Sequence, residues 1–341
     1  MSEVLFGSVT MIADLPEWPF PYQPIPRAHW EAGDYVVAEV LPQGEGTHEG
    51  FELSSGRHMF AMTNDLLVGA FARRFATLEA GGSFEAIGED GLMHCMSQGG
   101  AFGLITSKSR FTPSLMKIRY AGHVMVKGHK VNMRDYVPEP PDKEFGLPVL
   151  LIVGTSMSAG KTYAARVAVR LLKELGHKVA GTKLTGAGRR RDVLSMGDAG
   201  AAYIFDFIDA GLPTTVCPPD EYESAVTGLL ARIAETDANV VVVEAGASPL
   251  EPYNGAALVE LLGDTVAYTV LCASDPYGVV GIQDAWARKF DLVAGPSANT
   301  EASVQLVDRL AGLKALDLMS DQSYPEFRTE LEEAFGARGA D

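Results

Sequence analysis

Cysteine is scarce in this sequence, and the few cysteines that occur are far apart. There are three, Cys95, Cys217 and Cys272, with no Cys-x-x-Cys pair and no Cys/His spacing typical of zinc ligands. A disulfide framework and a structural zinc site are therefore excluded as the basis of the fold. So few cysteines suit a reducing compartment, and we expect a cytoplasmic protein.

Long apolar runs are also lacking. No uninterrupted run approaches the roughly 18–20 residues that a membrane-spanning helix needs. The N-terminal residues do not show the basic segment and apolar core of a signal peptide. We therefore expect no membrane partner.

Basic residues are fewer than acidic residues over the whole chain, but one segment is strongly basic. The sequence has 28 Lys and Arg against 44 Asp and Glu, for a formal charge of −16. Because nucleic-acid binding relies on Lys and Arg, this excess of acid excludes a general affinity for nucleic acid. From Lys161 to Arg191, however, nine residues are basic and one is acidic, whereas residues 192–287 contain one basic and fifteen acidic residues. The basic segment is where a small anionic ligand would find its counter-charge.

The chain of 341 residues is long enough for about two domains. The segment 138–148 is rich in Pro, Gly and charge, which indicates an exposed linker and predicts a β-rich domain over 1–145 and a second domain over 146–341. In the first domain, short alternating runs at 34–41, 115–120 and 123–127 predict antiparallel hairpins.

One helix is predicted in the first domain, running from a cap at Asn64 to about Glu79 with Leu67, Phe71 and Phe75 at helical spacing. The histidines of this domain, such as His123, are interpreted as structural or surface residues.

The second domain has the pattern of an α/β fold with a doubly wound parallel sheet. Apolar runs typical of buried strands alternate with helical patterns along it. The strands are predicted at 147–153, 177–181, 240–243, 266–272 and 292–294, and helices follow the first strand and occupy about 224–235 and 301–310.

The turn after the first of these strands is the most informative motif. A strict phosphate-binding loop, GxxxxGK[ST], would require Gly at Thr155, but the glycine lies one residue earlier. A loop of small residues can still direct its backbone N–H groups at phosphate oxygens, at the positive end of the following helix. We predict a phosphate site formed by Gly154, Thr155, Ser156, Ser158, Ala159, Gly160, Lys161 and Thr162.

Within this loop, Lys161 supplies a full positive charge to the phosphates, and the Thr162 hydroxyl can coordinate Mg²⁺. Glu244 ends the strand 240–243, so its carboxylate should face the same crevice and hold Mg²⁺ directly or through water. Asp192 and Asp198 are the alternatives for a second acidic ligand, of which we choose Asp198 for the metal site.

Three further features complete the predicted site. Lys183 follows the second strand and should project near the same crevice. The run Arg189–Arg191 is either a clamp for a carboxylate or phosphate or a solvated basic loop. Asn299 follows the last strand, on the side expected to bind the base. No NKxD run of the guanine-specific kind is present, which favours adenine or an undemanding base site.

The loop resembles that of dethiobiotin synthetase and its relatives among the cobyrinic acid amide synthases, which are P-loop NTPases. Beyond the loop, three segments are similar to the K-x-TG, GDG and DF-x-x-G series of the P-loop family that includes D-glutamate N-acetyltransferases; they are GTKLTG at 181–186, GDAG at 197–200 and DFIDAG at 206–211. Residues 244–248 (EAGAS) and the pair Asn299-Thr300 also resemble motifs of that family, and the similarity covers about 147–318.

The first resemblance implies that Lys183 holds a reacting carboxylate beside the γ-phosphate, although Leu184 stands where that family has proline. With ATP and Mg²⁺ as cofactors, Lys161, Lys183 and Glu244 would be the catalytic residues of a ligase or phosphoryl-transfer enzyme acting on a small anionic, carboxylated substrate. Related P-loop enzymes assemble as dimers, and a homodimer is one of the open alternatives here.

Two other functions are open at this point. The acetyltransferase resemblance implies that the loop binds the phosphates of an acyl-coenzyme A and that Glu244 acts as the base for an amine. The third alternative is a nucleotide-dependent chaperone or switch whose β-rich domain binds a protein.

Overall fold

The computed structural model describes residues 3–16, 18–48, 50–286 and 288–337. The chain divides into two units. The first comprises Met1–Glu139 together with the short segments Ala187–Arg191 and Phe207–Pro218, and the second comprises Pro140–Gly186, Asp192–Asp206 and Pro219–Asp341. The two short segments lie in the part of the sequence assigned above to the second domain, and the contacts that group them with the first unit join residues far apart along the chain.

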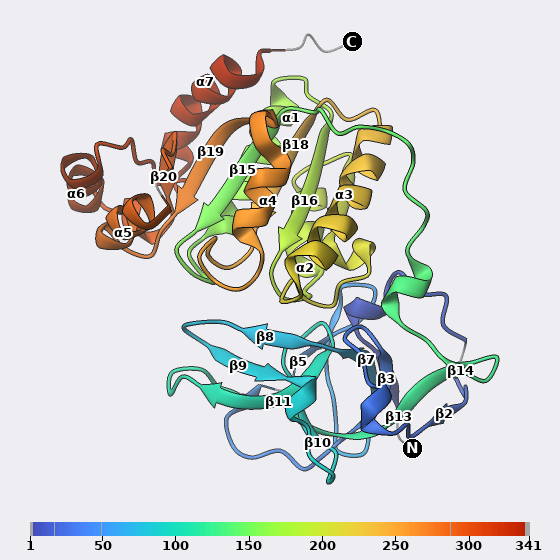
Figure 1. The fold of residues 1–341 in the computed structure, drawn as a ribbon. Coiled ribbons are helices and arrows are strands. Elements are labelled where there is room, and N and C mark those ends of the chain that lie inside the picture. The colour runs from blue at the N-terminus through green and yellow to red at the C-terminus, as the bar shows by residue number, and fades with distance from the viewer. Residues whose placement is uncertain (1–2, 17, 49, 287, 338–341) are drawn as a thin grey trace. The chain divides into compact units, whose positions relative to one another are not determined.

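The first unit consists of short strands and single turns of 3-10 helix (Figure 1). Its strands are β1 (Val4–Phe6), β2 (Tyr22–Gln23), β3 (Tyr35–Val40), β4 (Thr47–His48), β5 (Gly50–Glu52), β6 (His58–Phe60), β7 (Leu66–Phe71), β8 (Arg73–Phe75), β9 (Ala80–Ser83), β10 (Leu92–Cys95), β11 (Ala101–Lys108), β12 (Ser114–Leu115), β13 (Lys117–Val126) and β14 (His129–Lys130). The 3-10 turns are η1 (Ser8–Thr10), η2 (Arg27–His29), η3 (Phe84–Ala86), η4 (Met133–Tyr136) and η5 (Phe207–Ala210).

Five of these strands pair in a closed ring, in the order β7, β3, β13, β10, β11 and back to β7. All the pairs are antiparallel except β11 with β7, which is parallel. The ring encloses an apolar core that includes Phe71, Met93, Phe102 and Ile118, each fully buried. The predicted β-rich fold is therefore observed. Residues 117–120 and 123–126 of the two predicted runs lie in one strand, β13, and not in two strands of a hairpin; the pairing of β13 with β3 shifts between Tyr120 and Gly122.

The predicted helix over 64–79 is wrong, because this segment forms β7, β8 and the turns around them. Asn64 has a φ of 73° and belongs to a turn, so it does not cap a helix. All residues from Leu67 to Phe71 are buried, so the side chains on both faces of this strand are covered. The apolar residues that match a helical period also match strand alternation here, and pairing with β1, β3 and β11 decides between the two.

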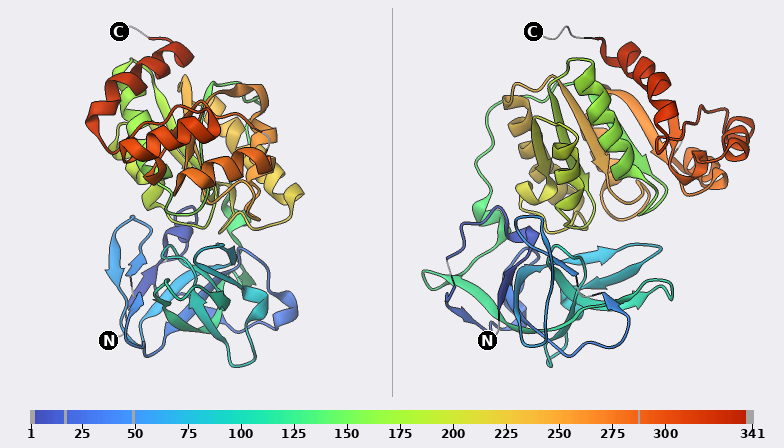
Figure 2. Two further views of the ribbon diagram at one scale, coloured as in Figure 1. Left: turned by 90° about the vertical axis from the view of Figure 1, so that its left-hand side faces the viewer. Right: turned by 180° about the vertical axis from the view of Figure 1, so that it is seen from behind.

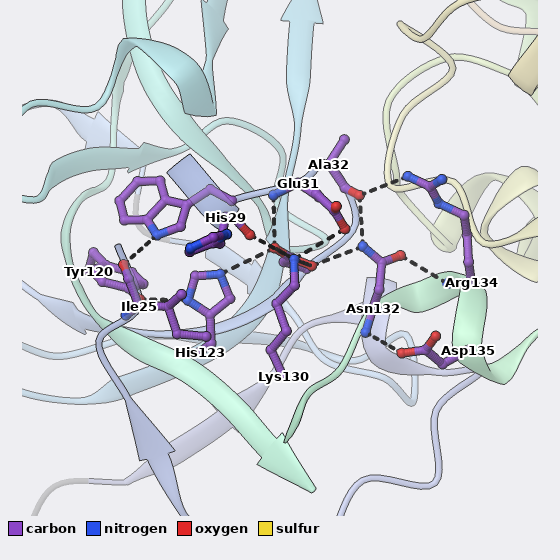
Figure 3. Close-up of polar contacts among 12 residues, drawn as sticks. Ile25, His29, Glu31, Ala32, Tyr120, His123, Lys130, Asn132, Arg134 and Asp135 are labelled. Carbon is purple, nitrogen blue, oxygen red and sulfur yellow. Dashed lines mark hydrogen bonds and ion pairs between the residues drawn. The ribbon is translucent and has the colours of Figure 1, made fainter. Parts of the chain in front are cut away.

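A buried carboxylate, Asp34, joins distant parts of the first unit. Figure 3 labels three of its partners, His123, Lys130 and Asn132. It accepts hydrogen bonds from Lys130 Nζ at 2.8 Å and Asn132 Nδ2 at 3.0 Å, and its Oδ2 lies 3.3 Å from His123 Nε2. The other ring nitrogen of His123 lies 2.6 Å from the Tyr120 hydroxyl. His123 is thus part of a buried hydrogen-bond network that ties β13 and β14 to the segment before β3.

Gly69 in β7 is a position where the first unit has no room for a side chain. A Cβ atom there would collide with the Gly100 carbonyl oxygen and the Phe102 ring. We expect Gly69→Ala to lower the free energy of unfolding by about 2 kcal/mol, because overpacking forces the neighbouring strand to shift. In Gly81→Ala, the matched control in β9, the nearest atom would be 3.5 Å away, so its stability should stay within about 0.5 kcal/mol of wild type in urea unfolding. Equal losses in the two variants would contradict this account.

The second unit is an α/β domain (Figure 1). Its strands are β15 (Val149–Gly154), β16 (Val179–Thr185), β17 (Tyr203–Asp206), β18 (Val240–Ala245), β19 (Val266–Cys272) and β20 (Leu292–Ala294). The helices are α1 (Lys161–Glu174), α2 (Arg191–Asp198), α3 (Pro219–Glu235), α4 (Gly255–Leu262), α5 (Pro276–Trp286), α6 (Glu301–Ala311) and α7 (Tyr324–Phe335), with 3-10 turns η6 (Gly263–Thr265), η7 (Pro296–Ala298) and η8 (Asp321–Ser323).

These six strands form one parallel sheet in the order β17-β16-β18-β15-β19-β20. Helices cover both faces, with α1 and α7 on one side and α3 and α4 on the other (Figures 1 and 2). The strands β15 and β18 are buried along their whole length, as their continuous apolar sequences require. The doubly wound parallel sheet is confirmed. Because the connection from β15 leads to one side and that from β18 to the other, a ligand crevice is expected at their carboxyl ends.

None of the helices in the described residues is long and apolar enough to cross a membrane.

Candidate functional site

The loop between β15 and α1 adopts a conformation that brings its backbone close to other chain segments. Ser158 and Gly160 both have positive φ, at 66° and 96°, and Gly160 immediately precedes the first residue of α1. Gly295, after β20, approaches so closely that a Cβ atom there would collide with the Ala159 carbonyl oxygen. The conformation of the loop is therefore restricted by its contact with Gly295 as well as by its own turns.

The buried Lys161 side chain folds back over this loop. Its Nζ donates a hydrogen bond of 2.7 Å to the Ser156 carbonyl oxygen. A Cβ atom at Gly154 would lie 2.9 Å from Nζ, so the glycine at this position makes room for the lysine. Burial lowers the pKa of Lys161, and the nearby Glu244 carboxylate opposes this. A buried ammonium group with one neutral acceptor is a strong electrostatic partner for an incoming anion.

The remaining loop residues contact the end of β19 and the residues just after it. The Thr155 N–H donates to the Cys272 carbonyl oxygen at 3.0 Å, and Thr155 Oγ1 accepts from the Ser274 N–H at 3.3 Å. The hydroxyls of Ser156 and Ser274 lie 3.2 Å apart. Ser274 carried no motif in the sequence and was missed. Its only signal was its position directly after a buried strand of a parallel sheet.

Thr162 and Glu244 are brought together as predicted from their places in the sequence. The Thr162 hydroxyl donates to Glu244 Oε1 at 3.1 Å. Glu244 is 3% exposed, and no hydrogen-bond donor reaches its Oε2 among the residues that the structure describes. Burial raises the pKa of the Glu244 carboxyl, and the Asp192 carboxylate raises it further, while Lys183 lowers it.

Lys183 lies on β16 beside Glu244 on β18, since the two residues are partners in the sheet register. Its Nζ forms an ion pair of 2.5 Å with Asp192 Oδ2. Burial lowers the pKa of Lys183, but Asp192, Glu244 and Asp206 together outweigh it and hold the pKa above its ordinary value. Lys183 is therefore charged and surrounded by carboxylates.

The structure brings Asp192, and not Asp198, to this cluster. Asp192 lies in the first turn of α2, whereas Asp198 is the last residue of that helix and is exposed. The choice of Asp198 as a metal ligand therefore has no support in the geometry. Asp206 was not among the predicted site residues. It is fully buried at the end of β17 and is the register partner of Lys183. An acid at the carboxyl end of a parallel strand was the signal that could have found it.

Two further predictions concern groups outside this cluster. Asn299 is exposed and follows η7, a few residues after the glycine that contacts the loop. In the run Arg189–Arg191, the N–H groups of Arg190 and Arg191 donate to the two carboxylate oxygens of Glu52, at 2.7 and 3.1 Å. Arg189 donates to Gln98 Oε1 at 2.9 Å. These contacts hold the backbone of Arg190 and Arg191 and the Arg189 side chain within the first unit, while Arg191 is exposed.

Among the described ranges, no group of three or more His, Cys, Asp or Glu side chains is arranged to hold a metal ion by itself. A magnesium ion commonly keeps several waters and takes one or two protein ligands plus phosphate oxygens. Thr162 and Glu244 offer hard oxygen donors of this kind, and the unpaired Glu244 Oε2 fits such a role.

Comparison with known proteins agrees with a phosphate-binding loop in this domain. Residues 139–315, a little over half of the chain, match the family described as "Domain of unknown function (DUF1611_C) P-loop domain". No curated protein matches the sequence.

Solved structures resemble the chain only distantly. They include chloroplast FtsY from Physcomitrella patens, with 14% identity, a TM-score of 0.37 and coverage of 52% of this chain and 59% of that one. HypB from Archaeoglobus fulgidus has 14% identity and a TM-score of 0.38, with coverage of 55% and 90%. A DUF1611 family protein from Anabaena variabilis has 15% identity and a TM-score of 0.37, with coverage of 57% and 62%. The chain thus spans less than two thirds of the moss and cyanobacterial proteins.

Proposed function

Because the chain belongs to the DUF1611 family through its P-loop domain, we propose that its second unit binds a nucleoside triphosphate with Mg²⁺ and transfers the terminal phosphoryl group to a small anionic substrate. The chain would then be an ATP-dependent ligase or transferase. The observation that carries this proposal is the convergence of Lys161, the Thr162–Glu244 pair and Lys183 at the carboxyl edge of β15, β16 and β18.

The loop supplies the binding of the phosphates. Its residues are small, two of them have positive φ, and the loop leads directly into the N-terminus of α1, where the helix dipole favours an anion. Lys161 would exchange its single bond to the Ser156 carbonyl for a charged phosphate oxygen. The positive charge that Lys161 contributes is therefore already in place at the loop before the phosphates and Mg²⁺ bind.

Thr162 and Glu244 are the groups that would hold the metal. Mg²⁺, when bound, neutralises charge on the phosphate oxygens and polarises the terminal phosphorus. The buried Glu244 carboxylate, whose Oε2 has no hydrogen-bond partner within the described part of the chain, has the chemistry for this role, directly or through a water molecule. Lys183, beside Glu244 on the neighbouring strand β16, would add a second positive charge for the terminal phosphate or for a carboxylate of the substrate.

A thermal-shift screen of the full chain tests the proposal. ATP, GTP, ADP and acetyl-coenzyme A are each added with Mg²⁺ or with EDTA, because a ligand that binds the native state raises the melting temperature. We expect the largest rise with a nucleoside triphosphate and Mg²⁺. A rise with acetyl-coenzyme A that is independent of Mg²⁺, and none with nucleotides, would contradict the proposal and select the acyltransferase alternative.

Glu244→Gln probes the metal role separately from the binding of the phosphates. The change keeps the volume and the acceptor for Thr162 but removes the charge. We expect the affinity for ATP in the presence of Mg²⁺, measured by calorimetry, to fall about tenfold, and the affinity in EDTA to change little. Glu260→Gln, at an exposed position of α4, is the matched control. An equal loss with and without Mg²⁺ would argue against a metal role for Glu244.

A further inference from the structure

The ion pair between Lys183 and Asp192 belongs to a cluster in which carboxylates outnumber ammonium groups. Lys183 faces three of them: Asp192 at 2.5 Å, and Glu244 and Asp206 as its partners on the neighbouring strands. Counting Lys161 as well, the cluster holds two positive and three negative groups. A nucleoside triphosphate brings further negative charge beside these carboxylates, and a bound Mg²⁺ would offset only part of it.

Asp192 is the member of the cluster best placed to move. Glu244 is 3% exposed and Asp206 is fully buried, and both lie at the ends of strands within the sheet. The Asp192 side chain is 13% exposed and lies on α2, a helix of eight residues. Between Lys183 and this helix lies Gly186, whose φ of 132° is open to glycine alone.

The Lys183 side chain lies where two neighbouring residues have no Cβ atom to confine it. Its stem runs beside two glycines, and a Cβ atom on either Gly186 or Gly246 would lie 3.1 Å from Lys183 Cε. Side chains at these positions would fix the lysine against Asp192. Without them, the ammonium group can turn toward a ligand at the loop while its stem stays packed.

We propose that Asp192 is a competing counter-ion that Lys183 exchanges for the terminal phosphate of a bound nucleoside triphosphate. This inference rests on the proposed function. Before a ligand binds, Asp192 keeps the buried ammonium group of Lys183 paired. Lys183 leaves Asp192 only for a ligand whose phosphate chain reaches past Lys161 to the carboxyl end of β16. A diphosphate, which ends earlier, leaves the pair in place.

The decisive variant is Asp192→Asn, which removes the competing charge and preserves the shape. Lys183 keeps Glu244 and Asp206 as neighbours, so its charge stays compensated. By calorimetry with Mg²⁺, we expect ATP to bind about tenfold more tightly than to wild type, while the affinity for ADP stays within about twofold. Asp220→Asn, in the exposed first turn of α3, is the matched control and should change neither affinity.

Other results would overturn the inference. Unchanged ATP affinity in Asp192→Asn means that the pair is not exchanged, and a loss of affinity confined to Mg²⁺ makes Asp192 a metal residue instead. If wild type binds neither ATP nor GTP, the proposed function fails first, and the inference fails with it. Wild-type binding with no gain in the variant overturns the inference alone.

A double-mutant cycle gives a second measurement. Lys183→Met should weaken ATP binding, and adding Asp192→Asn to it should bring no gain, because the group that the aspartate competes for is gone. Asp192→Ser replaces Asp192→Asn if circular dichroism shows that the asparagine variant does not fold. A gain of the same size with and without Lys183 would show that Asp192 acts by general repulsion, which contradicts the exchange.

Discussion

Lys161→Ala should reduce the affinity for a nucleoside triphosphate by at least about 100-fold, which corresponds to about 2.7 kcal/mol. The lysine is buried at the start of α1, and its ammonium group is bound only to a neutral carbonyl oxygen among the contacts described. Truncating one partner of a buried charge pair commonly costs 2 kcal/mol or more, and here the other partner is the phosphate itself. Isothermal calorimetry with ATP and Mg²⁺ measures the loss.

The matched control for this prediction is Lys173→Ala. Lys173 lies on the same helix, in its last turn, and is exposed. The two variants change net charge equally, so a difference between them reports the local role of Lys161 and not long-range attraction. Unchanged ATP binding in Lys161→Ala would remove the foundation of the proposed function.

Replacing Asp34 with alanine should lower the free energy of unfolding of the first unit by about 3 kcal/mol. The substitution leaves Lys130 and Asn132 without their shared acceptor, and it removes a carboxylate that is buried completely. Trp30 lies beside His123 and Tyr120, with ring centroids 6.0 and 4.7 Å away, so tryptophan fluorescence in urea follows this region. Asp14→Ala, at an exposed position in the same unit, should change stability little.

The contribution of Asp34 should also depend on pH. Burial raises the pKa of this carboxyl, but hydrogen bonds from His123, Lys130 and Asn132 outweigh burial and hold the pKa below its ordinary value of 3.8. Because the folded pKa is the lower one, the stabilisation is fully present above about pH 4 and is lost as the pH falls through the folded value. The difference between wild type and Asp34→Ala should therefore shrink below pH 4. A constant difference from pH 6 to pH 3 would mean that the charge contributes nothing.

Local sequence patterns were sufficient to predict a site whose residues are contiguous in the chain. The buried strand, the small-residue loop and the Gly160-Lys161-Thr162 sequence are contiguous, so the phosphate loop was identified despite the displaced glycine. The structure adds what the glycine at 154 does, since a Cβ atom there would crowd the Lys161 side chain. The contact between Glu244 and Thr162 was predictable because the carboxyl end of a parallel strand lies at the same edge of the sheet as the loop. The metal role of Glu244 stays a prediction.

Local sequence patterns were not sufficient where the same residues are compatible with two structures. Residues 64–79 fit a helix as well as strands, and pairing with strands that lie far away in the sequence selected β7 and β8. Asp192 and Asp198 have the same side chain and lie six residues apart. Only the position of α2 beside β16 brings one of them to Lys183.

The sequence by itself therefore determined the class of the second unit and the identity of its loop, because a parallel sheet and a phosphate loop each depend on contiguous residues. It did not determine which carboxylates surround Lys183, nor that residues 187–191 and 207–218 group with the first unit. Those features arise from contacts between residues far apart along the chain. The charge pattern shows the same division: the acidic total is visible in the composition, but only the folded chain pairs the buried lysines with particular acids.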